Sequence, residues 1–181
     1  MNDTATLFRK AVELSFDDFL AQYGFARTKS ESHPTGFGVT YRNGSRYIHI
    51  GGTLHPHDYP YYYYLTIGAG SDEFPESDWN GAALWRIMQR FAPDEYKKHE
   101  HLYDIPPEIT EAQIVDKVRI NRRLCELHAK DFLSGSLARL EEVRGIQNKG
   151  REPYKIYTPD SRGKYSMTYD KESEKLKKKY S

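Results

Sequence analysis

Strand-like alternation interrupted by a tight turn dominates the first half of the chain. Between residues 37 and 41, large apolar residues alternate with small or polar ones, a period of two that places the apolar side chains on one face of a strand. Asn43-Gly44 follows, a strong hairpin signal because both residues accept the positive φ of a two-residue turn. The chain returns through residues 47–50 and forms another strand-like run at 61–67. We therefore expect an antiparallel meander.

Helical periodicity flanks this predicted sheet. Apolar side chains recur near every 3.6 residues in 8–20, which predicts an N-terminal amphipathic helix. A second helix is expected to open at Ser77 or Asp78, and a long third helix is expected to run from a Thr110 cap to Gly135. The predicted class is α+β, with an antiparallel meander sheet of three to five strands packed against the N-terminal helix and the long helix.

Length and charge predict how the chain is organised. A chain of 181 residues is expected to form one main domain. Its net charge of +1 hides an asymmetry, because residues 151–181 carry nine basic and five acidic side chains. We therefore predict a single core at 1–150 and a basic C-terminal extension at 151–181, formed by a hairpin around 159–163 and a short helix. That hairpin could fold over the sheet.

The end of the extension is rich in lysine. Its four candidate residues are Lys175, Lys177, Lys178 and Lys179. A charge run of this kind is typical of a solvated, partly helical tail. The alternative is an arm that binds an acidic surface or a nucleic-acid backbone.

Cysteine content and hydropathy restrict the cellular setting. One cysteine, Cys125, excludes an internal disulfide and a multi-thiolate zinc site. No apolar run approaches the length of a membrane span, and residues 1–10 lack the apolar core of a signal peptide. We expect a soluble cytoplasmic protein that does not bind membranes.

Four of the seven histidines form two His-x-His pairs, His55/His57 and His99/His101. On a strand, such a pair presents two imidazoles to one metal ion, and a metal-bound water would then make a hydrolase. A proline separates the first pair, however, and the second lies in a charged stretch. Both patterns favour exposed loop histidines, so we predict no metal and no cofactor, and keep a metal-dependent hydrolase as an alternative.

Tyrosine is the outlier of the composition, with 15 residues. Seven tyrosines gather on the predicted sheet and its loops: Tyr41, Tyr47, Tyr59, Tyr61, Tyr62, Tyr63 and Tyr64. Tyrosine is enriched at binding hot spots because it combines a rigid apolar ring with a polar tip. It is also a favoured strand residue, so plain sheet packing is the other interpretation. Alternation turns either Tyr61 and Tyr63 or Tyr62 and Tyr64 outward, and the sequence leaves this choice open.

Several segments of the chain resemble a known group of proteins. They are Tyr23-Gly24-Phe25, the hairpin segment 39–44, the strand end 65–68 and the segment 127–135. In this order they are similar to small uncharacterised bacterial α+β proteins, some of which are similar to immunity proteins of toxin systems. The resemblance implies no catalysis and a surface that captures and occludes another protein. The tyrosine run and the extension are not part of the pattern.

The leading hypothesis is a non-catalytic, immunity-like protein-binding module of the bacterial cytoplasm that uses its tyrosine-rich sheet face. The first alternative is a nucleic-acid-binding protein that uses the tyrosine face and the basic tail. The second alternative is the metal-dependent hydrolase. A homodimer formed through the tyrosine face is compatible with each of them.

Overall fold

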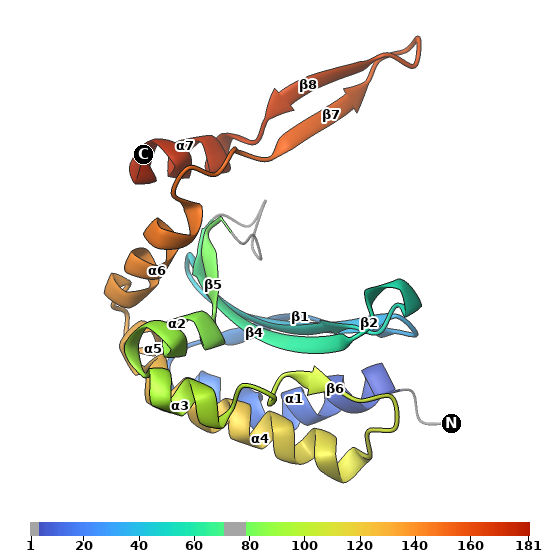
Figure 1. Cartoon of the computed structure of the whole chain (residues 1–181), viewed down its shortest axis with the longest axis vertical. Helices are drawn as coiled ribbons and strands as arrows, with labels where there is room; N and C mark the ends of the chain where they lie inside the picture. Colours follow the sequence, from blue (N-terminus) through green and yellow to red (C-terminus); the bar gives the residue numbers. More distant parts are fainter. Residues whose placement is uncertain (1–3, 71–78) are drawn as a thin grey trace.

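The computed structural model describes residues 4–70 and 79–181 and confirms the α+β class (Figure 1). Its helices are α1 (Thr4–Ala21), η1 (Pro56–Asp58), α2 (Leu84–Phe91), α3 (Pro93–Lys98), α4 (Glu111–His128), α5 (Lys130–Leu133), α6 (Ala138–Asn148) and α7 (Lys171–Tyr180). Its strands are β1 (Ala26–His33), β2 (Gly36–Asn43), β3 (Arg46–Thr53), β4 (Tyr61–Ala69), β5 (Gly81–Ala83), β6 (Asp104–Ile105), β7 (Lys155–Pro159) and β8 (Tyr165–Tyr169).

The main sheet is the predicted antiparallel meander, in the order β1-β2-β3-β4-β5. The Asn43-Gly44 turn joins β2 to β3, and Gly44 has the positive φ (59°) that this turn requires. Two very short strands extend the sheet beyond the strands that the alternation identifies. Both pair with β4: β5 pairs with residues 66–68, and β6 pairs with Tyr61 and Tyr62.

One face of the sheet packs against α1 and α4 and forms the core (Figure 1). The core-facing side chains of the sheet include Val39, Ile48, Ile50 and Leu65, which are all fully buried. Phe8 of α1 stacks on the β2 side chain at position 37 with ring centroids 5.0 Å apart. The apolar face of α1 therefore packs on the apolar face of the sheet in one layer, as expected.

The boundaries of two predicted helices differ from the structure. The helix expected from Ser77 or Asp78 begins at Leu84, because residues 81–83 pair with β4 instead. Ser77 and Asp78 lie outside the described residues. The long helix begins as predicted at a Thr110 cap, which forms a capping box with Gln113, but it ends at His128. The short helix α5 then occupies residues 130–133.

The extension contains a hairpin, β7-β8, followed by α7 (Figure 1). The hairpin projects away from the body and does not lie over the main sheet. Helix α7 packs beside α6, where the Tyr180 hydroxyl donates to the Glu141 carboxylate at 2.8 Å. Within the described part of the chain, no helix has the length and apolar character needed to cross a membrane.

Candidate functional site

Three of the seven candidate tyrosines lie in the interior: Tyr41, Tyr47 and Tyr63. Each hydroxyl donates to an internal acceptor: the Asp17 carboxylate at 2.8 Å, the Asn80 amide oxygen at 2.6 Å and the Lys117 carbonyl at 3.1 Å, respectively. Burial, together with Asp17, raises the pKa of Tyr41 well above its ordinary value. These three rings support the fold and present no surface to a partner.

The other four candidates reach the surface. Tyr62 and Tyr64 turn away from the core and are 47% and 40% exposed, which settles the orientation that the sequence left open. Tyr61 is half-buried and packs edge-on against the exposed Tyr59, with ring centroids 5.4 Å apart. The outward tyrosines of β4 therefore alternate with the core-facing ones, as the strand period requires.

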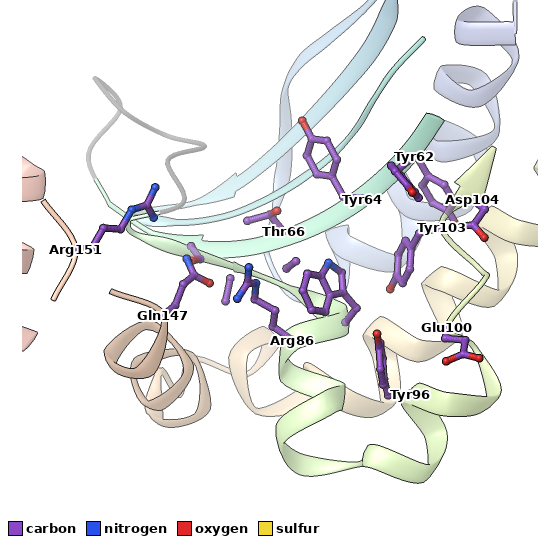
Figure 2. A pocket seen from close by; sticks show the side chains of 15 residues that line it. Tyr62, Tyr64, Thr66, Arg86, Tyr96, Glu100, Tyr103, Asp104, Gln147 and Arg151 are labelled. Carbon is purple, nitrogen blue, oxygen red and sulfur yellow. The ribbon is translucent and has the colours of Figure 1, made fainter. Parts of the chain in front are cut away.

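Tyr62 and Tyr64 form one wall of a cleft of about 900 Å³ (Figure 2). The opposite wall comes from Trp85 of α2 and Tyr96 of α3, whose ring centroids are 6.3 Å apart. Tyr103, beside β6, lines the same space. We call the volume between these five rings the aromatic cleft.

The aromatic cleft has charges of opposite sign at its two ends. Figure 2 shows Arg86 and Arg151 towards one end and Glu100 and Asp104 towards the other. The Arg86 guanidinium lies 4.7 Å over the Trp85 ring, a cation–π contact that leaves its N–H groups available to a ligand. A ligand with an acidic group and a basic group could therefore bind in one orientation.

The acidic end of the cleft is fixed from beneath by α4. The Lys117 ammonium donates to the main-chain carbonyls of His101 and Leu102, at 3.1 and 2.8 Å. Burial lowers the pKa of Lys117. The Tyr103 hydroxyl donates to Asn121 of the same helix at 3.2 Å. These bonds hold the turn that carries Glu100, so this wall of the cleft is preorganised.

Several polar groups of the cleft are not used by the fold. Within residues 4–70 and 79–181, the hydroxyls of Tyr62 and Tyr96 and the indole N–H of Trp85 have no hydrogen-bond partner. Arg86 has no ion pair in the same part of the chain. Rings with unpaired polar tips, in a concave space, are the usual composition of a binding site rather than of a packed interior.

The four candidate histidines are placed in two separate turns. His55 caps η1, and its ring lies 5.1 Å from the ring of His57. His99 follows α3, and the His101 Nδ1 atom lies 3.0 Å from the Asp104 carboxylate. Among the residues that the structure describes, no three His, Cys, Asp or Glu side chains gather in a way that could hold a metal ion.

The lysines of the tail lie on α7. Lys177 and Lys179 are paired with carboxylates, Glu152 at 2.7 Å and Glu141 at 2.5 Å, respectively. Lys175 and Lys178 are exposed. Lys179 therefore ties the extension to α6 of the body, whereas the Lys177 ion pair lies within the extension.

The one cysteine is placed where it cannot react with a substrate. Cys125 lies on the buried side of α4 and is fully enclosed. Burial raises the pKa of its thiol to about 12, so the thiolate form is absent near neutral pH.

Sequence reasoning missed the helix-borne wall of the cleft. Trp85 follows the apolar period of α2 and reads as a core residue, yet it is only partly buried and faces the cleft. Tyr96 and Arg86 carry no motif at all. The one available signal was the concentration of aromatic residues on both sides of residue 80.

Comparison of the chain with protein-family models, with curated protein sequences and with solved structures gave no match.

Proposed function

We propose that this chain is a non-catalytic protein-binding module of the immunity-like kind, which captures a protein partner in the aromatic cleft. The observation that carries the proposal is the set of unpaired polar tips on Tyr62, Trp85 and Tyr96 in a concave, aromatic-lined space. Partly exposed Tyr and Trp in a hollow are typical binding hot spots, because they bury much area at low entropic cost.

The charged ends of the cleft support a peptide segment as the bound element. A loop or strand of a partner would place an acidic side chain near Arg86 and a basic side chain near Glu100 and Asp104. Opposite charges at fixed positions select one orientation of the bound segment and speed its association. The proposal includes a cytoplasmic location in a bacterium, which rests on the sequence resemblance and the single cysteine.

A capture experiment tests this function. The tagged protein is used as bait in a nuclease-treated extract of its native cell, beside the double variant Tyr62→Ala/Tyr96→Ala and the control Tyr157→Ala. Tyr157 is 60% exposed and lies outside the cleft. We expect one protein in near-stoichiometric amount with the wild type and the control. The double variant is expected to bind the purified partner at least about 30-fold more weakly.

Two outcomes of the capture experiment would contradict the proposal. A partner retained by the double variant, or no stoichiometric protein partner at all, would show that the cleft is not a protein-binding site. Thermal unfolding of the variants shows whether they are folded. We expect them to fold, because both substitutions truncate side chains that reach the surface.

A further inference from the structure

The hairpin of the extension has the composition of a binding arm. We call residues 155–169, β7 and β8 with their turn, the arm. Nine of its ten strand residues are exposed, and the tenth, Tyr169, is partly exposed. Isolated two-stranded hairpins are marginally stable in water, so an arm of this kind usually has a partner.

Strand register gives the arm two different faces. Residues opposite one another in an antiparallel pair share a face, and the register pairs Tyr157 with Met167 and Tyr165 with Pro159. Tyr157 and Tyr165 are 60% and 70% exposed. The other face carries mainly hydroxyl side chains, such as Thr158. One side of the arm is therefore an open platform of tyrosine rings.

The arm is positively charged. It carries Lys155, Arg162 and Lys164, and none of the three has an ion pair within residues 4–70 and 79–181. Its one carboxylate, Asp160, accepts from the backbone N–H groups of Arg162 and Lys164 at 2.8 Å each and so belongs to the turn. The exposed Lys178 belongs to α7, the helix that follows the arm.

The base of the arm is firmly held, which makes its direction a property of the fold. The Asp170 N–H donates to the Tyr154 carbonyl at 2.8 Å, and the Tyr154 N–H donates to the Ser173 hydroxyl at 3.1 Å. Asp170 also caps α7. Two chain segments are thus joined immediately below the exposed rings.

We propose that the arm binds single-stranded nucleic acid, with bases stacked on Tyr157 and Tyr165 and phosphates paired with Lys155, Arg162 and Lys164. Exposed aromatic rings beside unpaired cations are the combination that single-stranded nucleic acids require. A second copy of the chain fits less well. Packing two arms face to face would oppose like charges, because each arm carries three basic side chains and one acidic one.

Fluorescence anisotropy tests the proposal directly. The full chain is titrated into labelled oligothymidylate and oligouridylate of about 20 nucleotides, with a duplex as control. We expect both single strands to bind more tightly than the duplex. Three phosphate contacts predict that affinity falls about 20-fold between about 50 and 200 mM salt. Tighter binding of oligouridylate than of oligodeoxyuridylate, which differs from it only in lacking the 2′-hydroxyl, would identify contacts to that group and support RNA as the ligand.

Matched variants separate stacking from charge. Tyr157→Ala/Tyr165→Ala should weaken binding by roughly 30-fold, and Lys155→Gln/Arg162→Gln/Lys164→Gln should abolish the salt dependence. The control Thr158→Ala/Thr168→Ala changes the opposite face of the arm and should bind as the wild type does. A second control, Lys177→Gln, removes a lysine that is already paired with Glu152.

Three results would overturn the proposal. The first is no change in anisotropy at low salt. The second is binding that the arm variants do not alter. The third is a dimer in sedimentation that depends on Tyr157 and Tyr165, which would make a second copy the partner of the arm. The capture experiment uses a nuclease-treated extract, so nucleic acid bound to the arm does not affect it. The arm residues are exposed and lie outside the cleft, so the two proposals are tested independently.

Discussion

Tyr47 shows at residue scale how a tyrosine of the outer sheet face became part of the interior. Its ring lies directly over Gly68 of β4, where any Cβ would overlap it. A Cβ at Gly81 would lie 2.6 Å from its hydroxyl oxygen. The hydroxyl donates to Asn80 in a fully buried bond. Glycine is therefore required at Gly68 of β4 and Gly81 of β5 because the ring needs the space, and not because of backbone conformation.

The first stability prediction follows from this contact. Gly68→Ala should lower the free energy of unfolding by about 1–3 kcal/mol, because the added methyl group displaces a buried ring. The matched control is Gly145→Ala in α6, where a Cβ would lie at an ordinary 3.6 Å from the Tyr180 ring. Helix propensity predicts that this control gains roughly 0.5–1 kcal/mol. Urea unfolding measures the free energy of unfolding of both variants. Equal effects of the two substitutions would show that the Tyr47 ring does not require the space at Gly68.

Residue identity alone did not reveal which tyrosines would be available for binding. Tyr62 and Tyr63 are identical neighbours, yet one faces the cleft and the other lies in the core. A shift of register by one residue would exchange them. The register depends on how the whole of β4 pairs with β3. The local sequence predicts that successive residues alternate between the two faces of the strand. It does not predict which residues face the core.

At the scale of elements, strong local signals predicted structure well. The Asn43-Gly44 turn and the Thr110 cap are confirmed because each forms its hydrogen bonds within four residues. Residues 81–83 and 104–105 became strands for a different reason, since both lie along one edge of β4. Strands of two or three residues have no period of their own, so only the tertiary structure specifies them.

Helix α7 depends on one carboxylate of α6. Glu141 accepts from the Lys179 ammonium at 2.5 Å and from the Tyr180 hydroxyl at 2.8 Å, and it lies 3.4 Å from the buried Arg144 guanidinium. Burial on its own would raise the pKa of Glu141. The hydrogen bonds and neighbouring cations outweigh it, so the pKa is lowered from 4.5.

This arrangement predicts a pH-dependent stability. A carboxylate with a lowered folded-state pKa stabilises the fold above its unfolded pKa, and that stability is lost as the pH falls below about 4.5. Glu141→Gln should therefore destabilise the protein by about 1–2 kcal/mol near neutral pH, since Arg144 loses its partner. The difference from the wild type should shrink at about pH 3. Urea unfolding at both pH values is the measurement; a difference that does not depend on pH would contradict the role of the charge.

At the scale of the whole molecule, the chain presents two separate surfaces. The aromatic cleft lies between β4 and the helices α2 and α3, and the arm projects from the body beyond α7 (Figure 1). The sequence predicted the class, the meander and a hairpin in the extension, because each rests on local patterns. It did not predict the cleft, because Trp85 and Tyr96 meet Tyr62 only after α2 and α3 fold back beside β4.

Site-specific photo-crosslinking in the native cell tests whether the aromatic cleft binds a protein. Benzoylphenylalanine is placed at Tyr62 or Tyr96 in the cleft, and at Leu14, which is 87% exposed on α1, as the control. We expect both cleft positions to crosslink to the same single protein and position 14 to give no crosslink to it. Crosslinks to that protein from position 14 alone, or none from the cleft, would contradict this expectation.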